Sequence, residues 1–318
     1  MKQNKDFYLL EKKILGLADK VEALKNEDPE THRGQIEKIR ETISREWEKL
    51  LPTLVPINFV QIARHPRRPL TLDYIDKMTT GFTEFHGDRR AGDDPAIVAG
   101  FAFFHGKSIC VIGHQKGKTT RERLARNFGQ PNPEGYRKAY RIMKLAEKFN
   151  CPVLTLIDTQ GAFPGLEAEE KGQAEAIAFN LKEIAKLRVP VINVVIGEGG
   201  SGGALAIGVG DTLLMLQYAY YSVITPEGCA AILWKDQSAV SQAAENLKFL
   251  AEDLKKLGVV DSIIPEAPGG AHIDPDLTIQ NVDDAVQKTM ESLQKKSLDE
   301  LLEDRYQKFR NIGVFEER

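Results

Sequence analysis

The sequence Val189-Pro-Val-Ile-Asn-Val-Val-Ile196 runs directly into the glycine-rich string Gly197-Glu-Gly-Gly-Ser-Gly-Gly203. An earlier segment, Cys151-Pro-Val-Leu-Thr-Leu-Ile-Asp158, likewise runs into a glycine-containing turn that ends at Gly165. Unbroken runs of Val, Ile and Leu are typical of strands that are covered on both faces. The two segments therefore predict neighbouring strands of a buried, largely parallel sheet.

A helical pattern lies between these two segments. Ala174, Ile177, Leu181, Ile184 and Leu187 recur every three or four residues, as expected for a helix that buries one face. A strand, a helix and a second strand in this order form the crossover of a parallel sheet. The sequence therefore predicts an α/β fold.

The two ends of the chain carry the pattern of amphipathic helices. Near the N-terminus, apolar residues at helical spacing lie on either side of a break at Asp28, which predicts a helical hairpin. Residues 283–310 show a similar helical pattern. We therefore expect an N-terminal helical region over residues 1–55, a core over 56–270 and a C-terminal helical extension over 271–318.

The composition is that of an ordinary folded protein. Of the 318 residues, 42% are hydrophobic and 28% are charged, and the net charge is −3. This balance disfavours disorder and also general nucleic-acid binding, which usually needs a strong basic excess. No apolar run approaches the roughly 18 residues of a membrane span, and the N-terminus lacks the apolar region of a signal peptide. We expect a cytoplasmic protein with no role for a membrane.

Cysteine and histidine usage gives no sign of a metal site. Cys110, Cys151 and Cys229 lie far apart in apolar stretches, and the six histidines do not cluster along the sequence. An odd number of cysteines without zinc-ligand spacing predicts buried, reduced thiols and no metal in this chain.

The glycine string after Ile196 leaves backbone N–H groups uncovered, because no β-carbon shields them. An oxyanion hole built from such amides needs no dedicated catalytic side chain. The turn after Asp158 ends a neighbouring strand, and ligands of open α/β sheets usually bind at the carboxyl ends of strands. We therefore predict that the two turns converge on one crevice, where Asp158 either acts in the chemistry or ties down its own loop.

The string by itself also fits other sites. A G-x-G-x-x-G pattern of dinucleotide-binding proteins begins at Gly197, but no acidic residue follows about 20 residues later. Ser201 lies in a G-x-S-x-G pattern and is followed by Asp261 and His272, the order of an α/β-hydrolase triad. A tight turn that binds nothing is a further alternative, so the string alone does not select one function.

Longer strings of the chain resemble one family. They are Leu72-Asp-Tyr-Ile75, Ile112-Gly-His-Gln-Lys-Gly117, Arg126-Asn-Phe-Gly-Gln-Pro131, Pro133-Glu-Gly-Tyr-Arg-Lys-Ala139, both glycine turns, Tyr221-Ser-Val-Ile-Thr-Pro-Glu-Gly-Cys229 and Asp261-Ser-Ile-Ile-Pro-Glu266. In this order, and over nearly the whole chain, they resemble the alpha subunits of acetyl-CoA carboxylase carboxyltransferase.

The resemblance implies a crotonase-like (ClpP/crotonase) fold, a spiral of β-β-α units with flanking N- and C-terminal helices. It also implies transfer of the carboxyl group from carboxybiotin on a carrier protein to acetyl-CoA, which gives malonyl-CoA in the first committed step of fatty acid synthesis. A beta subunit would complete the enzyme as an alpha2-beta2 heterotetramer, and biotin carboxylase would join the larger complex. Zinc is expected only in the beta subunit, and no cofactor is expected to be bound covalently to this chain.

We expect backbone amides to be the catalytic groups, namely those of Gly202, Gly203, Gly161 and Ala162. Substrate contacts are expected from His114, Lys116, Lys118, Arg121, Phe163, Gly199, Gly200 and Ser201. The basic residues would attract CoA phosphates or the acidic carrier, or else form a solvated helix face, and His114 could instead be a hydrogen-bonded structural residue. Two rival functions remain: an acyl-CoA hydrolase or serine esterase that uses Ser201, and a non-catalytic scaffold subunit.

Overall fold

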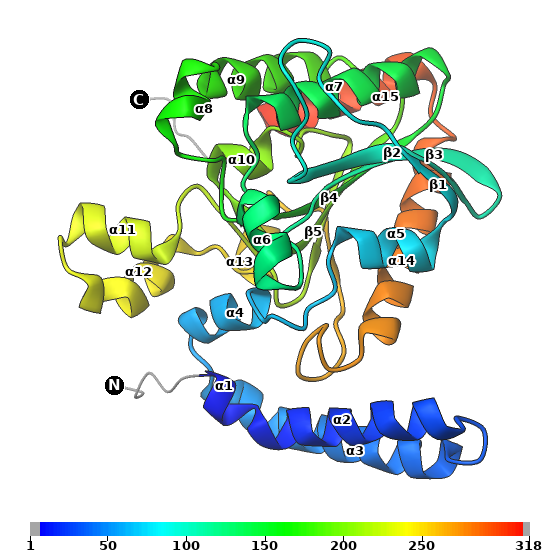
Figure 1. Ribbon diagram of the computed structural model, residues 1–318, viewed down its shortest axis with the longest axis vertical. Coiled ribbons are helices and arrows are strands. Elements are labelled where there is room, and N and C mark those ends of the chain that lie inside the picture. The colour runs from blue at the N-terminus through cyan, green and yellow to red at the C-terminus, as the bar shows by residue number, and fades with distance from the viewer. Residues whose placement is uncertain (1–6, 314–318) are drawn as a thin grey trace.

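One sheet of eight strands runs through the middle of the molecule (Figure 1). The computed structural model describes residues 7–313. The strands are β1 Thr80–Glu84, β2 Ile97–Phe104, β3 Lys107–His114, β4 Val153–Thr159, β5 Val191–Gly200, β6 Thr212–Leu216, β7 Tyr220–Ser222 and β8 Ser262–Ile264. They lie in the order β1-β2-β3-β4-β5-β6-β8, and β7 pairs with β5. This order brings β4 and β5, the strands that precede the glycine turns, to the centre of the sheet.

β1 pairs with β2, and β2 with β3, in the antiparallel sense. The pairs β3–β4, β4–β5, β5–β6, β5–β7 and β6–β8 are all parallel. β4 pairs with β5 from Val153 opposite Val191 onward, and every residue of both strands is buried. The helix between them, α9 Gln173–Ile184, is the predicted crossover. The prediction of an α/β fold with two adjacent, buried parallel strands is confirmed.

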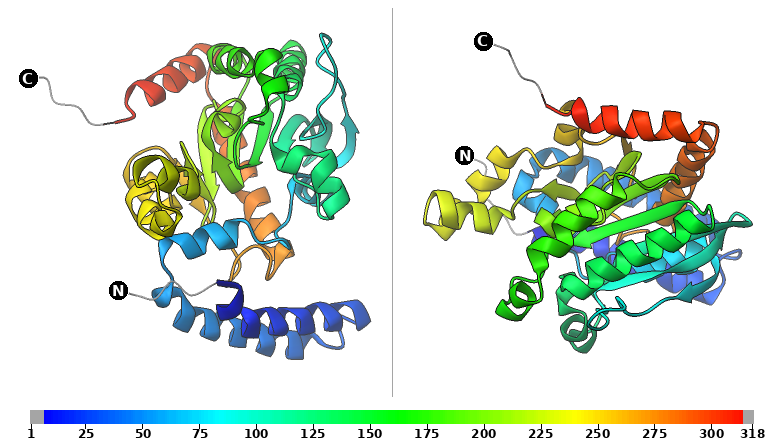
Figure 2. Two further views of the ribbon diagram at one scale, coloured as in Figure 1. Left: turned by 60° about the vertical axis from the view of Figure 1, so that its left-hand side comes forward. Right: turned by 90° about the horizontal axis from the view of Figure 1, so that it is seen from above.

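Helices cover the sheet on both sides (Figures 1 and 2). α7 Pro133–Lys148, α9 and α15 Leu298–Arg310 lie on one side, and α5 Thr71–Met78 and α14 Pro275–Leu293 lie on the other. Val282 and Val286 of α14 are fully buried in the same hydrophobic core as the sheet. The helices near the C-terminus therefore pack directly on the sheet.

The helical pattern predicted over residues 283–310 is two helices, and the first begins earlier. Asp274 caps α14 by accepting a hydrogen bond from the amide of Leu277, and Pro275 occupies the first turn. Ser297 caps α15 by accepting from the amide of Glu300. Side-chain caps determine where a helix begins, and apolar periodicity does not report them.

The N-terminal helices form the predicted hairpin. α2 Lys12–Glu27 and α3 Arg33–Leu50 lie side by side along the lower edge of Figure 1. They bury a small core of their own, which includes Ile43 and Trp47. The indole Nε1 of Trp47 donates to the hydroxyl of Tyr218 at 2.9 Å, and this bond ties the hairpin to the main body.

The remaining helices are short. They are α1 Phe7–Leu10, α4 Pro56–Ala63, α6 Thr120–Ala125, α8 Leu166–Glu170, α10 Ser201–Leu205, α11 Pro226–Leu233, α12 Val240–Leu247 and α13 Ala251–Lys256, with 3-10 turns at Leu51–Thr53, Asn127–Gly129 and Gln237–Ala239. α11 and α12 project sideways from the core (Figure 1). Across residues 7–313, none of the helices is long and apolar enough to cross a bilayer. All three cysteines are buried, as predicted.

Candidate active site

The two glycine turns lie against each other at the carboxyl ends of β4 and β5. A β-carbon on Gly200 would overlap the carbonyl group of Gln160, and one on Gly203 would lie 2.5 Å from the amide nitrogen of Ala162. Real β-carbons essentially never make contacts under 3.0 Å, so only glycine lets the two backbones approach this closely. The predicted convergence of the turns is confirmed.

The amides of Ala162, Gly202 and Gly203 have no acceptor among the described residues. α10 begins at Ser201, so the amides of Gly202 and Gly203 lie in its first turn, where a helix offers no acceptor. Within residues 7–313, these two amides and that of Ala162 donate to no protein group. The Gly161 amide differs, because it donates to Oγ1 of Thr159 at 3.1 Å. The expected set of donors therefore shrinks to Ala162, Gly202 and Gly203.

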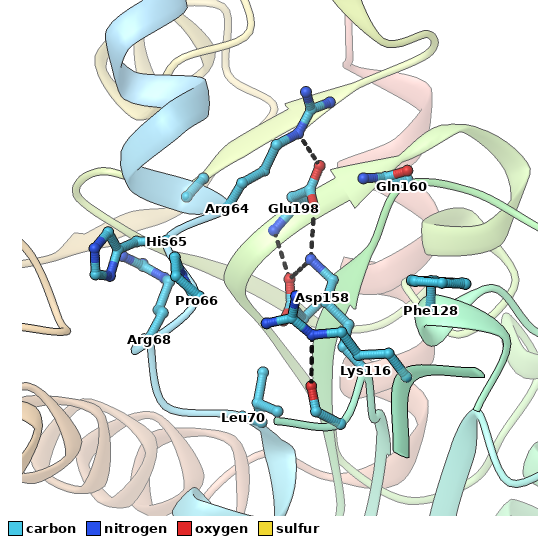
Figure 3. A pocket seen from close by; sticks show the side chains of 13 residues that line it. Arg64, His65, Pro66, Arg68, Leu70, Lys116, Phe128, Asp158, Gln160 and Glu198 are labelled. Atoms are coloured by element: carbon cyan, nitrogen blue, oxygen red, sulfur yellow. Dashed lines mark hydrogen bonds and ion pairs between the residues drawn. The ribbon is translucent and has the colours of Figure 1, made fainter. Parts of the chain in front are cut away.

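A pocket of about 140 Å³ lies beside the turns (Figure 3). Asp158 and Gln160 reach it from the first turn, and Glu198 reaches it from the end of β5. Lys116 enters from the loop after β3, and Arg64 enters from the end of α4. Four separate segments thus bring two carboxylates, two cations and an amide to one place.

Ion pairs join the charged residues of this pocket. The ammonium of Lys116 lies 2.7 Å from Oδ1 of Asp158 and 2.6 Å from Oε1 of Glu198. Nε of Arg64 lies 2.7 Å from the other oxygen of Glu198, which also accepts a hydrogen bond from the hydroxyl of Tyr220 at 2.6 Å. Burial alone would raise the pKa of Glu198, but the charges of Lys116 and Arg64 outweigh it and lower that pKa to about 2. Glu198 is therefore ionised at neutral pH.

Burial and opposite charges also compete at the ammonium group of Lys116. Burial opposes the charged form of Lys116, but the carboxylates of Asp158 and Glu198 more than compensate, so the pKa of Lys116 is raised. Lys116, Arg64, Asp158 and Glu198 thus carry two positive and two negative charges. We call these four residues the charge clamp.

Comparison with known proteins places the chain in a family. A family model described as "Acetyl co-enzyme A carboxylase carboxyltransferase-like" matches residues 7–313. The chain belongs to this family. A relative from Bacillus cereus (strain G9842) is 54% identical over 306 residues, which cover 95% of this chain and 94% of the relative. Another relative, from Geobacillus sp. (strain WCH70), is 52% identical over 308 residues, which cover 96% of this chain and 95% of the relative. Both are named "Acetyl-coenzyme A carboxylase carboxyl transferase subunit alpha".

Solved carboxyltransferase structures share the fold. The transcarboxylase 12S structure with hydrolysed methylmalonyl-coenzyme A bound matches with a TM-score of 0.59 at 21% identity, over 72% of this chain and 43% of that one. The beta subunit of P. aeruginosa geranyl-CoA carboxylase matches with a TM-score of 0.56 at 17% identity, over 82% of this chain and 48% of that subunit. This chain therefore spans less than half of either. The predictions of a crotonase-like fold and of a carboxyl-transferring enzyme that acts on acetyl-CoA are confirmed.

The basic residues that were expected to attract substrate lie in different environments in this carboxyltransferase. Lys116 points into the pocket, where two carboxylates hold it. Lys118 lies outside, 61% exposed, and pairs with Asp73 at 2.6 Å. Arg121 is exposed on α6. The residues therefore do not act as one cationic patch, and Lys116 has no free charge to offer a phosphate.

His114 lies beneath the turns and has no exposed surface. Its Nδ1 accepts a hydrogen bond from the amide of Asp158 at 3.4 Å. Burial lowers the pKa of His114 to about 3, and this effect outweighs the backbone groups of Gly203 and Leu156, which raise it. His114 is thus a neutral residue that is enclosed beneath the first turn, where it has no surface for the expected substrate contact.

The other glycines of the string are part of the sheet. Gly199 and Gly200 are buried in β5, where they pair with Tyr221 and Ser222 of β7. A dinucleotide fingerprint needs its glycines in the loop after the strand, so this reading is wrong for the chain. Phe163 is half-buried, and its amide donates to the Pro131 carbonyl at 3.0 Å.

The hydrolase triad does not assemble. Ser201 is exposed and has a left-handed backbone, with φ of 52°. Asp261, however, accepts from the amide of Leu213 at 2.6 Å and pairs with Lys308. His272 is buried and pairs with Glu11 at 2.8 Å. Because both partner residues are engaged elsewhere, the serine esterase reading is wrong.

Arg64, Glu198 and Phe128 are among the residues of the pocket to which sequence reasoning assigned no role. The backbone of Asn127 and Phe128 is left-handed, with φ of 47° and 55°, and the Phe128 side chain lines the pocket while 50% exposed. The order Asn-Phe-Gly was a usable signal, since asparagine and glycine tolerate this conformation best. Arg64 gave no local signal, because its partners lie far away in the sequence.

Proposed function

We propose that the chain is the alpha half of an acetyl-CoA carboxylase carboxyltransferase, in which the amides of Ala162, Gly202 and Gly203 stabilise the negative charge that develops on carboxybiotin. The observation that supports this assignment is the close backbone contact of the two glycine turns, which leaves those three amides without a protein acceptor. Backbone donors held in advance are suited to an oxyanion because they need no reorganisation during the reaction.

The beta subunit would bind acetyl-CoA and complete the crevice. Carboxybiotin, presented by a carrier protein, supplies the CO2 and is left with negative charge on its ureido oxygen. In this chain, Ala162, Gly202 and Gly203 would donate hydrogen bonds to that oxygen and orient the ring toward the partner's half. Orientation and charge stabilisation would share the catalysis. The biotin nitrogen that loses CO2 would take the proton from the acetyl methyl group, and the resulting enolate would form the new bond to CO2, so no side chain of this chain is assigned as a general base.

The proposed assembly is an alpha2-beta2 heterotetramer served by a biotin carboxyl carrier protein and by biotin carboxylase. The family name and the alpha-subunit relatives support a multi-subunit carboxylase. Zinc would belong to the beta subunit.

A matched pair of substitutions at Gly202 tests the oxyanion hole. Gly202→Pro removes the N–H group, and proline is tolerated in the first turn of a helix. Gly202→Ala keeps the N–H group and adds a β-carbon that would meet only the Ile177 side chain, at 3.3 Å. We expect the proline variant, assembled with beta, to lose about 100-fold or more in kcat, while the alanine variant stays within about 3-fold of wild type.

The assay is carboxyl exchange between malonyl-CoA and free biotin. Co-purification with beta and an unchanged circular dichroism spectrum control for folding. Equal kcat values for the proline and alanine variants would remove the amide of Gly202 from the mechanism. Activity that survives damage to both turns would favour the scaffold reading instead.

A further inference from the structure

Lys116 joins the two glycine turns through side chains. Asp158 is the residue at which the first turn begins, and Glu198 is the second residue of the glycine string Gly197–Gly203. The Lys116 ammonium contacts one oxygen of each, at 2.7 Å and 2.6 Å. Oδ1 of Asp158 also accepts a hydrogen bond from the backbone amide of Glu198 at 2.9 Å. A single cation therefore holds both strand ends in one arrangement (Figure 3).

The burial of this arrangement makes it stiff. The side chains of Asp158 and Glu198 are 4% and 2% exposed, and that of Lys116 is 16% exposed. Ion pairs at the surface contribute little, whereas breaking a buried pair leaves an uncompensated charge at a large cost. The three groups therefore restrict how far the turns can shift relative to each other.

The charge balance has a consequence for the reaction. Without Lys116, two carboxylates would face each other within the same turns whose amides are proposed to hold a third negative charge. The other charged or titratable groups here are Arg64 and Glu227, which pair with each other at 2.6 Å, Arg123, Tyr220 and His65, and the buried Arg68, Tyr74 and His114. The charge of Arg68 also acts on Asp158, but its guanidinium pairs with Glu266. Among the described residues, only Lys116 forms an ion pair with the carboxylate of Asp158.

We propose that Lys116 is a positioning residue of the carboxyltransferase site: it fastens the two glycine turns together through one carboxylate from each and cancels their negative charge beside the oxyanion. This inference rests on the proposed function. Lys116 touches no reacting atom in this scheme. It acts through the two turns, and through them on the amides of Ala162 and Gly203.

A double-mutant cycle with the reconstituted alpha-beta enzyme tests the role. Lys116→Met is expected to lower kcat for malonyl-CoA:biotin exchange about 100-fold at pH 8, with both KM values within about 3-fold of wild type. Asp158→Asn keeps the oxygen that accepts from Glu198 and is expected to cost about 10-fold in kcat. The double variant restores the charge balance, so its kcat should lie about 10-fold above that of Lys116→Met.

The dependence of kcat on pH distinguishes a charge-balancing role of Lys116 from a packing role, because the loss of packing alone would not vary with pH. In Lys116→Met, one of the two facing carboxyl groups takes up a proton as the pH falls, because like charges cannot both remain ionised cheaply. The kcat of this variant relative to wild type should therefore rise several-fold from pH 8 to pH 6. Lys116→Arg keeps the charge and should retain most of the kcat.

Several outcomes would overturn the proposal. They are a kcat of Lys116→Met within about 3-fold of wild type, or losses that multiply in the double variant at every pH. If Lys116→Met does not assemble with beta, the kcat of Asp158→Asn becomes the decisive measurement. An unchanged kcat in Asp158→Asn would then contradict the proposed role of Lys116. Wild-type enzyme without exchange activity would instead overturn the proposed function, and this inference with it.

Discussion

Two buried charge clusters of this molecule are built in opposite ways. The charge clamp at the glycine turns matches carboxylates with permanent cations, lysine and arginine. The second cluster matches the carboxylate of Glu11 with two imidazoles: Nε2 of His65 lies 3.1 Å from one oxygen, and Nε2 of His272 lies 2.8 Å from the other. The imidazole rings stack with their centroids 3.8 Å apart.

The two clusters serve different positions in the fold. The clamp lies where two strands end and catalysis is proposed, and its Glu198 carboxylate stays ionised over the physiological pH range. The histidine cluster lies where the N-terminal hairpin meets the main body, since Glu11 directly precedes α2 and His65 follows α4. The site is thus held by permanent cations, whereas the attachment of the hairpin is sensitive to acid.

The histidine cluster also has ligand atoms within 4.8 Å of one another, a spacing that suits a metal ion. The hydrogen bonds favour a different arrangement. The amide of Arg67 donates to Nδ1 of His65 at 3.3 Å, which places the imidazole proton on Nε2, facing Glu11. A metal ion on Nε2 would need that proton moved to Nδ1, against the Arg67 amide.

Removing one carboxylate from the clamp is expected to have the largest effect on stability. Glu198→Gln leaves Arg64 and Lys116 buried with less negative charge, so the free energy of unfolding should fall by about 3–5 kcal/mol. Glu227→Gln is the matched control, because Glu227 also pairs with Arg64 but is 48% exposed, and it should cost less than about 1 kcal/mol. Urea unfolding at pH 7 measures both, and similar losses would contradict the buried character of the clamp.

Acid should weaken the histidine cluster at a pH where Glu198 of the clamp is still ionised. Burial lowers the pKa of His272 from 6.5 to about 4, although hydrogen bonding to Glu11 opposes this shift. A histidine with a lowered pKa stabilises the fold fully above pH 6.5 and loses that contribution as the pH falls toward 4, because the unfolded chain takes up the proton first. The loss is on the order of 3 kcal/mol, since one pKa unit corresponds to about 1.4 kcal/mol.

Burial would raise the pKa of Glu11, but hydrogen bonds to both histidines outweigh it and lower that pKa. Its contribution to stability is therefore lost only below about pH 4.5, at the lower end of the range in which the contribution of His272 is lost. Thermal unfolding between pH 7 and pH 4.5 therefore measures the loss from His272. His272→Gln removes the titrating ring and should flatten the profile, whatever it does to stability at pH 7. A profile equally steep in wild type and variant would assign the acid sensitivity to other groups.

The smallest effect is expected outside both clusters. Lys118→Ala removes an exposed ion pair with Asp73 and should change the free energy of unfolding by less than about 1 kcal/mol. The oxygen of Asp73 that caps α5 through the Leu70 amide is a different one and stays in place. The KM for malonyl-CoA should keep its wild-type dependence on salt. A KM that rises and loses this dependence would show that Lys118 attracts the phosphates of the substrate.

Much of the fold was predictable, because its signals are local. The apolar runs before Asp158 and Gly197 correctly predicted adjacent buried strands, and the stripe between them predicted the crossover helix. Periodicity failed at boundaries: the helix predicted from residue 283 begins at Pro275. In the site, the contact of the two turns was predictable because glycine allows a backbone approach that any β-carbon prevents.

Local patterns in the sequence were enough to indicate the family, the adjacency of the strands before the glycine turns and the residues able to form a hole of backbone amides. Which charges meet was visible only in the folded molecule. Lys116 was predicted as a free cation, and the histidines as scattered, yet folding places Lys116 between Asp158 and Glu198 and stacks His65 on His272. Apolar periodicity and glycine turns depend on residues only a few positions apart, so they can be recognised in the sequence. The partners of a buried charge come from segments far apart in the sequence, so they depend on which segments the fold brings together.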